Sequence, residues 1–578
     1  METQTTKSTN HATIVALLLA TGLVLFTASC TNKHYQKAAD KAAYSAIKQK
    51  TPLVKNMDEH FTIEQTNVLS LVGLPRSTNA VIFLGKDGQA EQGSAILSLK
   101  NALETGVNHS RVYQTHKEQL YISALGLSLA EHQFAPIFGA HGTTTYGVAT
   151  KDTKEIERII INPVTHTTNA VLSDNLVETH RIEGGTKVGT DLLLATGGRL
   201  AVSFTTTILR YMSGDSASTT FSRLGATFVQ PFWRGAGYKV ALEDVTQAER
   251  SLLYAIRDFT RFRKTFSVDI ATAYYNVLKA RDEARNSYIN YQNSRQNADR
   301  TRALAQEGRL AQADLGRLEQ QELTSENNWV GAVLNYKRSL DNFKIELGLP
   351  TDEHVVLDDE ELTALKIDHP EISVDDSIKV ALAMRLDYQN AREELEDAER
   401  QVPLTANKLR PGVDVVANGG ISSDRSQILP NPKRYDWDVQ LNVDLPLERT
   451  VERNSYRRAL IAVEAAKRNV TLQEDQIKLQ VRDGWRALEQ AKRAYEISKV
   501  GVQIAERRVE EQSLLAELGR AKAQDQVDAQ NDLAASRNQY TQALVGHTVA
   551  RLLFWENLGI LYIKDAGQWE EPNNAKLN

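Results

Sequence analysis

The chain has 578 residues, of which 24% are charged, 41% hydrophobic and 7% aromatic. This length is too great for one ordinary compact domain and predicts three or four units unless the molecule is elongated. The 68 basic and 73 acidic residues give a formal net charge of −5, so we expect no nucleic-acid partner. A single cysteine excludes a disulfide framework and any multi-cysteine metal site. The mean hydropathy of −0.39 excludes a polytopic helical membrane protein but not a β-barrel, whose strands are only half apolar.

An apolar run over residues 12–28 follows a lysine and ends in two small residues. Its length and flanks predict a secretory signal peptide, residues 1–29, and not a stable transmembrane helix. The only cysteine, Cys30, comes next, and Thr27-Ala28-Ser29-Cys30 resembles a bacterial lipobox, in which the cysteine becomes the lipid-acylated N-terminus. The threonine at the start of this motif departs from the usual leucine, so a plain cleaved signal is the alternative. Thr31 after the cysteine, rather than Asp, suits sorting of such a lipoprotein to the outer membrane.

Two stretches of the chain match each other, and each residue of the second lies 211 positions after its counterpart. The offset does not change along the stretch, so we predict an internal duplication. The matching residues are Ala280, Arg281, Ser287, Gly308, Arg309, Asp314, Ala332, Leu347 and Gly348 in the first copy, and Ala491, Lys492, Ser498, Gly519, Arg520, Asp525, Ala543, Leu558 and Gly559 in the second.

A heptad spacing within both copies predicts the seam of a coiled coil. Its positions are Val277, Ala280, Ala284, Ser287, Tyr291, Ser294 and Ala298 in the first copy, and Leu488, Ala491, Tyr495, Ser498, Val502, Ala505 and Val509 in the second. The other faces, as in residues 286–302, are polar, so both sides of the helical layer should contact water. A solvated helical hairpin with an ordinary core is the simpler alternative.

No proline interrupts residues 237–306, and a helix of this length would extend roughly 105 Å, more than a globular interior requires. Gly308 and Gly519 then supply the break expected at a helix C-terminus. Asp314 and Asp525 follow where the returning helix would start and where its dipole favours a carboxylate. Each copy is therefore predicted to be a helix, a tight tip and a second helix running back.

Upstream of the second helical pair, residues 435–446 alternate between apolar and polar side chains. One face carries Tyr435, Trp437, Val439, Leu441, Val443 and Leu445, and the other carries Asp436, Asp438, Gln440, Asn442 and Asp444. In a soluble sheet this would be a half-buried strand. Its length, its aromatic end and the signal sequence favour a transmembrane barrel strand with the first set facing lipid. Pro411 begins the preceding strand, and Pro446 ends this one.

The first copy has the same order in a looser form. Pro136 lies 275 positions before Pro411, and Pro231 matches Pro446. Residues 200–208 and 224–228 again alternate between apolar and polar side chains. The segment between its two prolines is 60 residues longer than its partner, and the sequence leaves open whether the surplus forms a long loop or extra strands. Alanine-, leucine- and glutamate-rich helical stretches, 96–134 and 373–410, precede the two strand regions.

This order resembles the outer membrane efflux protein (TolC-like) family, as a lipoprotein member, over roughly residues 96–560. The resemblance rests on the duplication, on both Gly-Arg-x-x-x-x-Asp tips, on the paired Leu-Gly ends, and on Gln230-Pro231-Phe232 and Leu445-Pro446-Leu447 at the strand exits. It implies a mainly α fold with β strands: a long coiled-coil helical barrel and a trimeric transmembrane β-barrel with an internal twofold repeat. Three protomers would each give four strands to the barrel.

The same resemblance implies a passive conduit across the bacterial outer membrane and periplasm, in a tripartite efflux or type I secretion system. Its partners would be outer-membrane lipid, a periplasmic adaptor (membrane fusion protein) and an inner-membrane transporter. The expected parts are a signal peptide at 1–29, a lipidated extension at 30–95, a first repeat at 96–348, a linker at 349–372, a second repeat at 373–559 and a tail at 560–578. The first repeat would contain a β-hairpin at about 136–233, a helical hairpin at about 237–348 and a tip at about 308–314. The second would contain the equivalent parts at about 411–446, 447–559 and 519–525.

Acidic residues after the second tip line the periplasmic entrance in such proteins, and matching positions are Asp525 and Asp528. Three copies would form two anionic rings that favour cations. Helix N-terminal carboxylates are the plainer interpretation of both. The residues expected to dock the adaptor are Gly308, Arg309, Leu310, Asp314, Gly519 and Arg520. The tyrosine and arginine latches used by some members are replaced here by Ala516 and Ala521.

No phosphate loop, Gly-x-Ser-x-Gly elbow or His-Glu-x-x-His metal helix occurs in the sequence, so we expect neither an enzyme nor a cofactor. His166 and His180, in the long first strand region, are interpreted as surface residues and not as ligands. The rival hypothesis is a periplasmic lipid-anchored adaptor or coiled-coil scaffold of a transport complex. Such a protein needs only one helical hairpin, whereas this chain predicts two in register. The transported compound is not readable from the sequence.

Overall fold

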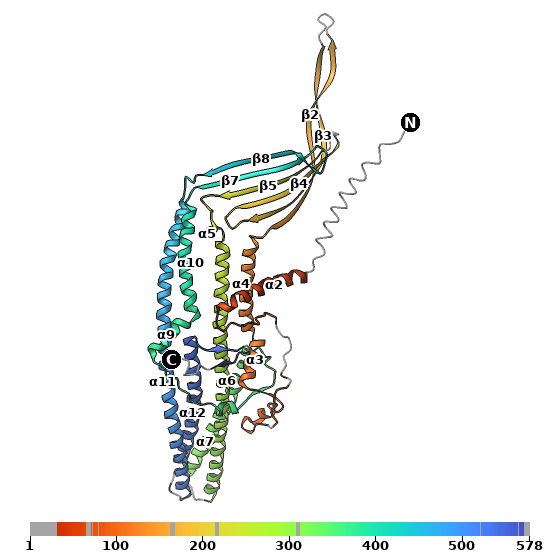
Figure 1. The fold of residues 1–578 in the computed structure, drawn as a ribbon. Helices are drawn as coiled ribbons and strands as arrows, with labels where there is room; N and C mark the ends of the chain where they lie inside the picture. The colour runs from red at the N-terminus through yellow and green to blue at the C-terminus, as the bar shows by residue number, and fades with distance from the viewer. Residues whose placement is uncertain are drawn as a thin grey trace. The chain divides into compact units, whose positions relative to one another are not determined.

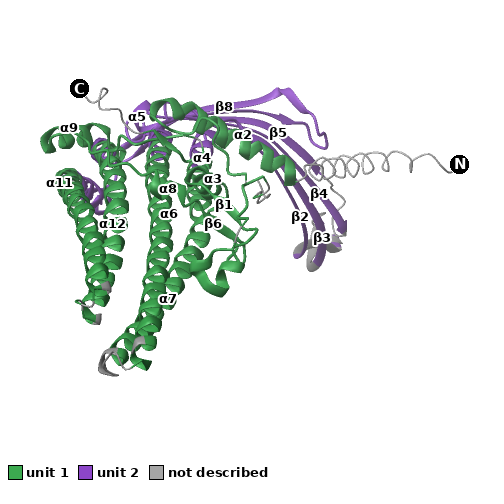
Figure 2. Ribbon diagram, turned by 90° about the horizontal axis from the view of Figure 1, so that it is seen from below, with its two compact units in different colours: residues 1–125, 252–394, 466–578 green, residues 126–251, 395–465 purple. Residues whose placement is uncertain are grey.

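The computed structural model describes residues 32–64, 71, 73–78, 80–161, 168–213, 219–307, 312–518, 520, 522–564 and 566–570. The chain divides into two compact units, each assembled from separate segments (Figure 2). Unit 1 consists of residues 1–125, 252–394 and 466–578, and unit 2 of residues 126–251 and 395–465.

Unit 2 contains an antiparallel sheet of six strands in the order β2-β3-β4-β5-β7-β8 (Figure 1). The strands are β2 Ile137–Ile161, β3 Thr168–Leu193, β4 Arg199–Ser213, β5 Thr219–Pro231, β7 Gly412–Ser423 and β8 Pro430–Asp444. The expected β-hairpin at 136–233 is therefore wrong, since that region forms four strands. Most of the 60 surplus residues are extra strand and not a long loop, because β2 and β3 are 25 and 26 residues long.

The two long strands extend beyond the rest of the sheet. β3 pairs with β4 only from His180 onward, whereas its pairing with β2 continues down to Thr168. Residues 149–161 and 168–179 thus form a two-stranded ribbon that continues past the sheet. The sequence of this ribbon is highly charged, with six ionisable residues between 151 and 158.

β8 begins at Pro430, five residues before the predicted start of the strand at Tyr435. Pro430 and Pro432 lie within β8. They are tolerated because β8 is an edge strand of the sheet, where a missing backbone N–H leaves no interior hydrogen bond unmade.

Unit 1 holds most of four long helices: α6 Glu243–Gln306, α7 Gln312–Leu347, α11 Thr450–Glu517 and α12 Ala523–Leu558. α6 has 64 residues and α11 has 68, which correspond to lengths of about 100 Å. A short helix, α5 Tyr238–Ala241, precedes α6. All the predicted seam positions are buried or half-buried, which is the pattern expected of a coiled-coil stripe.

The helix ends follow local rules that recur along the chain. Ser98 and Ser373 each accept a hydrogen bond from the backbone N–H three residues later, and so cap α3 Leu99–His109 and α9 Val374–Met384. After single extended residues, Ser110 and Arg385, the chain continues as α4 Arg111–His132 and α10 Leu386–Lys408. Gly348 and Gly559 adopt φ of +80° and +74° after α7 and α12, where a side chain would be strained.

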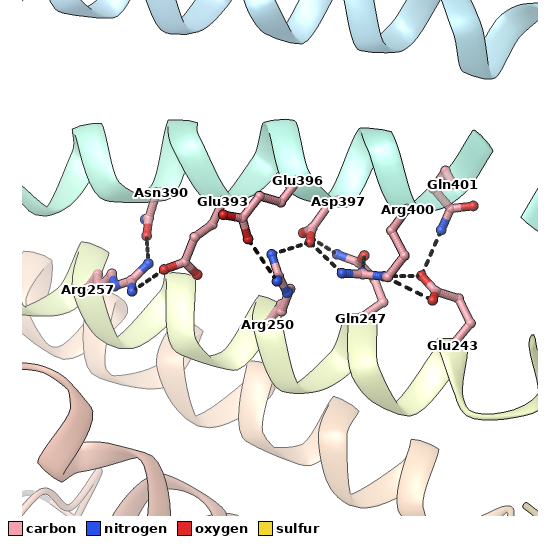
Figure 3. Close-up of polar contacts among 10 residues, drawn as sticks. All are labelled: Glu243, Gln247, Arg250, Arg257, Asn390, Glu393, Glu396, Asp397, Arg400 and Gln401. Carbon is pink, nitrogen blue, oxygen red and sulfur yellow. Dashed lines mark hydrogen bonds and ion pairs between the residues drawn. The ribbon is translucent and has the colours of Figure 1, made fainter. Parts of the chain in front are cut away.

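Helices α6 and α10 are joined by arginine side chains (Figure 3). In unit 1, Arg257 Nη2 lies 2.6 Å from Glu393 Oε1. In unit 2, Arg250 Nη1 lies 2.7 Å from Asp397 Oδ1, and Arg400 Nε donates to Glu243 at 3.0 Å. Because arginine forms planar, charge-assisted pairs with carboxylates, this row fixes the register of the two helices.

Short elements of unit 1 lie along the long helices. The N-terminal extension forms α2 Asn32–Lys50, η1 Thr51–Leu53 and η2 Ile82–Gln89, and the linker forms α8 Glu360–Thr363. β1 Ala95–Leu97 pairs in parallel with β6 Val355–Leu357, so the end of the extension and the linker share a small sheet. Residues beyond Gly559 form β9 Tyr562–Ile563 and β10 Trp569–Glu570, which pair with each other.

A buried ion cluster attaches the extension and the linker to the helical hairpin. Arg281 of α6 donates to Tyr336 of α7 at 2.9 Å, and its Nη1 lies 3.1 Å from Glu91 Oε2. Its Nε lies 3.0 Å from Asp359 Oδ1, in the acidic linker. The guanidinium also lies over the ring of Phe83, 5.7 Å from its centroid. Burial raises the pKa of the Glu91 carboxyl, and the charge of Arg281 opposes that rise.

Candidate functional site

One face of the six-stranded sheet is predominantly apolar. Residues directly opposite in antiparallel strands share a face, so the register of the sheet assigns every position. From β2 to β8 the apolar face carries Phe138, Ala140, Tyr146, Val188, Ile182, Leu200, Val202, Phe204, Leu224, Ala226, Phe228, Ala417, Ile421, Tyr435, Trp437, Val439, Leu441 and Val443. Leu445, predicted with this face, follows the last residue of β8.

Large side chains on this face are exposed in the single chain. Trp437 is 73% exposed, Phe138 80% and Leu441 67%. A soluble sheet would bury such a face against a second layer. An exposed apolar surface of this extent marks contact with a membrane or a partner.

The opposite face of the sheet is polar and cross-linked between strands. Asp436 pairs with Arg223 of β5, and Asp444 pairs with Arg234. Asn418 of β7 donates to Asp438 at 3.0 Å. The aspartates of β8 were predicted to share a face, but their arginine partners were not, because they lie more than 200 residues away in the sequence and only the strand register brings them together.

Amide side chains join α6 to α12 in unit 1. Asn286 donates to Asn538 at 2.9 Å and Asn290 to Asn531 at 3.1 Å. Asn297 donates to Gln530 at 3.3 Å. We call these three pairs the amide seam. Residues 286–302 were expected to contact water. Asn286 is an exception because it is buried against α12, whereas Arg295, Gln296, Asp299 and Arg300 are exposed.

The amide seam links α6 of the first helical hairpin to α12 of the second through neutral hydrogen bonds. Each neutral hydrogen bond adds about 0.5–1.5 kcal/mol net, because water can replace the partner when the contact opens. A small apolar contact of Ala298, Leu318 and Val527 lies nearer the helix ends.

Asp525 and Asp528 lie at the start of α12. Asp525 is the third residue of the helix and is exposed, and Asp528 is half-buried and accepts a hydrogen bond from Gln524 at 2.8 Å. Residues three apart share a helix face, so the two carboxylates are neighbours. This position fits both an anionic ring and a helix N-terminal carboxylate.

Arginines near the tips form ion pairs that the sequence analysis missed. Arg508 of α11 pairs with Asp532 of α12, and Arg302 of α6 lies 3.4 Å from Glu319 of α7. A signal for the first pair exists in the sequence. Arg508 and Asp532 lie equally far before and after residue 520, so a tight helical hairpin places them side by side.

Several predicted site residues lie outside the described residues. These are Cys30, Gly308, Arg309, Leu310 and Gly519, as is His166. Asp314 falls in the first turn of α7, and Arg520 is exposed between α11 and α12. The lipidation and docking assignments therefore stay predictions.

A histidine pair lies between the linker and the helices α11 and α12. His547 of α12 is fully buried, and neither of its ring nitrogens has a hydrogen-bond partner among the described residues. Its ring centroid lies 5.9 Å from that of His369, whose Nε2 lies 2.9 Å from Glu489 Oε1. Burial lowers the pKa of His547 to about 4, and the charge of Arg551 lowers it as well.

This buried imidazole predicts a loss of stability in acid. Histidine titrates near 6.5 in an unfolded chain, so between pH 6.5 and 4 the unfolded state binds more protons than the folded state. The neutral, buried His547 makes its full contribution to the free energy of unfolding above pH 6.5, and about 2 kcal/mol of that contribution is lost at pH 5. We expect His547→Phe to flatten the fall in thermal midpoint between pH 7 and pH 5. The matched change at the exposed His60, His60→Phe, should leave that slope as it is, and equal slopes in both variants would contradict the prediction.

The described residues contain neither a candidate metal site nor a candidate membrane-spanning helix. No group of three or more His, Cys, Asp or Glu side chains there could hold a metal ion. Among the helices described, none combines the length and apolar character needed to cross a bilayer.

The fold is similar to that of solved bacterial outer membrane proteins. The Campylobacter jejuni CmeC outer membrane channel has a TM-score of 0.58 and 13% identity, covering 83% of this chain and 88% of its own. The Vibrio cholerae outer membrane protein VceC has a TM-score of 0.57 and 15% identity, covering 80% and 96%. The open-state MtrE outer membrane channel of Neisseria gonorrhoeae has a TM-score of 0.53 and 12% identity, covering 80% and 89%. The expectation of a mainly α fold with β strands, shared with outer membrane channels, is confirmed at the level of the fold.

The sequence comparisons give a different and weaker signal. A model of the family Peptidase M66 matches residues 11–166, which is less than a third of the chain. The sequence contains no His-Glu-x-x-His motif, in which two histidines would bind zinc and the glutamate would act as general base. No curated protein matches the chain. The similar solved structures are channel proteins and not enzymes.

Proposed function

We propose that this chain is one protomer of a homotrimeric channel in the bacterial outer membrane. The channel is a passive conduit of a tripartite efflux or type I secretion system, lipid-anchored at Cys30 and extending into the periplasm. One observation carries the proposal: a six-stranded sheet exposes an apolar face on all its strands and a charged, cross-linked face on the other side. Lipid satisfies the first face and a water-filled lumen the second.

The helical part of the chain supports the same function. Helices α6 and α11 are about 100 Å long and carry exposed polar residues, as expected for walls with water on both sides. The 211-residue offset between Gly348 and Gly559 extends the proposed duplication to the ends of α7 and α12. Two equivalent hairpins per protomer would give a trimer a regular helical cylinder.

The rival function, a lipid-anchored adaptor or scaffold, makes the opposite prediction for extraction. With Cys30 replaced by Ser to prevent acylation, a barrel should stay in the membrane through carbonate washing and need detergent for release. A scaffold held only by its anchor should appear in the wash. The detergent-extracted protein should then form cation-conducting pores in planar bilayers, and release without detergent together with absent conductance would reject the channel.

The tip carboxylates are the proposed periplasmic gate. Three copies of Asp525 and Asp528 would concentrate six negative charges at the entrance and hold divalent cations there. We expect Asp525→Ala with Asp528→Ala to raise single-channel conductance or weaken block by divalent cations severalfold. Asp483→Ala removes an exposed carboxylate of α11 far from the tip and should behave as the unmodified channel. Unchanged conductance and block in the double variant would leave both aspartates as helix N-terminal residues.

A further inference from the structure

The two edges of the six-stranded sheet are complementary. Within the described residues, β2 and β8 each pair with one strand only, β3 and β7 respectively. Five successive antiparallel pairings separate them, so β2 and β8 run in opposite directions. The β8 edge of one copy can therefore join the β2 edge of a second copy in an antiparallel ladder, with every strand of the resulting sheet alternating in direction.

The extra strands β2 and β3 have the character of barrel strands. Phe138, Tyr146 and Val188 lie on the same face as Trp437 and Leu441, as the register of the sheet requires. Gly139, His141 and Lys187 lie on the face of Asp436 and Asp438. A strand pair lying outside the membrane would not need one apolar face and one polar face that continue those of the other strands.

The division ends where the rest of the sheet ends. The pair Val148 and His180 is the last one in which β3 also contacts β4, and the charged ribbon begins beyond it. Residues 137–148 therefore provide 12 positions of edge, close to the 9–11 residues of a transmembrane strand. The ribbon would continue into water, where its charged residues are stable.

We propose that β8 of each protomer pairs with β2 of the next, so that six strands per copy close a barrel of 18 strands in the trimer. The inference rests on the proposed function and replaces the expectation of four strands per protomer. In lipid, unpaired edges leave backbone N–H and C=O groups without partners, and this closure satisfies both edges. The partner at these edges is thus a second copy of the same chain.

An 18-stranded barrel would be wide. Strands about 4.8 Å apart and tilted by about 40° give a backbone diameter of about 36 Å for 18 strands, against about 24 Å for 12. The membrane part would then not be the narrowest point of the conduit. Resistance to flow would lie instead at the helical tips, where Asp525 and Asp528 are placed.

Cysteine cross-linking in intact outer membranes tests the pairing. Asp438→Cys, Gln440→Cys and Asn442→Cys in β8 are each combined with Gly139→Cys, His141→Cys or Thr143→Cys in β2, all on the polar face. Because disulfides require Cα atoms within about 7 Å, mild oxidation should link only combinations along one register, yielding covalent dimers and trimers. The wrong-face combination Val439→Cys with His141→Cys and each single variant should stay monomeric on denaturing gels. The single variants also report any link through Cys30.

A competing arrangement, in which β8 pairs with β4 of the next protomer, predicts different cysteine cross-links. If β2 and β3 lay outside the cylinder, β8 would meet β4 of the neighbour, and Asn442→Cys would link to Ser203→Cys or Thr205→Cys. Links to β4, or conducting trimers without β8–β2 links anywhere in the grid, would overturn the inference and leave the channel function intact. Monomers without conductance would instead reject the proposed function itself.

Discussion

Replacing Leu441 with Arg should sharply reduce insertion of this protein into membranes, whereas replacing the neighbouring Gln440 with Arg should not. Leu441 is exposed on the apolar face of β8, near the middle of the alternating segment. An arginine facing the bilayer midplane costs about 2–4 kcal/mol per copy, and a trimer would carry this cost three times. At Gln440 the same side chain would extend into the lumen, beside the aspartates of β8.

Folding into phosphatidylcholine vesicles measures this difference. The inserted protein is titrated with urea, and protease resistance reports the fraction that stays folded. The urea concentration at the unfolding midpoint should be far lower for Leu441→Arg than for Gln440→Arg or the unmodified chain. If the two variants were equally impaired, the apolar face would not contact lipid. If both were unaffected and the protein were stable without vesicles, the sheet would belong to a soluble scaffold.

The helices were the part of the fold that the sequence predicted best. The absence of proline from 237–306 and the left-handed glycines Gly348 and Gly559 are local features, and they act the same way in any tertiary context. The breaks at Ser110 and Arg385 were not foreseen. Arg385 has no helix-breaking propensity of its own, and its side chain is held by Asp387 and Gln480, the second of which is distant in sequence.

The first strand region was predictable only in part. Alternation in β4 and β5 is clear, but β2 and β3 are rich in glycine and threonine and continue into a charged ribbon, which hides a period of two. Their face assignment emerges only from the register against β4. The sequence of β2 or β3 alone does not show which side chains face lipid, because the residues on the two faces of each strand are similar in polarity. The pairing with neighbouring strands is needed to assign the faces.

The contacts that build the candidate site were beyond sequence reasoning for the same reason. The face of the β8 aspartates followed from alternation, whereas Arg223 was identified only through pairing across β5 and β7. The amide seam joins Asn286 to Asn538, and nothing in the sequence distinguishes either asparagine from the exposed polar residues beside it. Which polar residues of a long helix contact a second hairpin depends on helix rotation, which composition does not encode.

Arg281 is the residue of unit 1 whose loss should be most damaging. Its side chain is 6% exposed and contacts Glu91, Tyr336 and Asp359 from three separate segments. Removing one member of a buried ion pair typically costs about 3–5 kcal/mol, because the remaining charge has no partner. Arg281→Met should therefore release residues 82–91 from the helices, visible as faster hydrogen exchange across that segment.

The neighbouring Arg285 provides a matched control. It also pairs with Asp359, at 2.6 Å, but its side chain is 36% exposed, so Arg285→Met should cost about 1 kcal/mol or less. Lowering the pH should reduce the difference in hydrogen-exchange rate between Arg281→Met and Arg285→Met. Burial already raises the pKa of Glu91, and without Arg281 the carboxyl takes up a proton more readily as the pH falls, which removes the uncompensated charge. Equal exchange rates in the two variants at pH 7, or a gap that widens toward pH 5, would show that this cluster does not hold the extension in place.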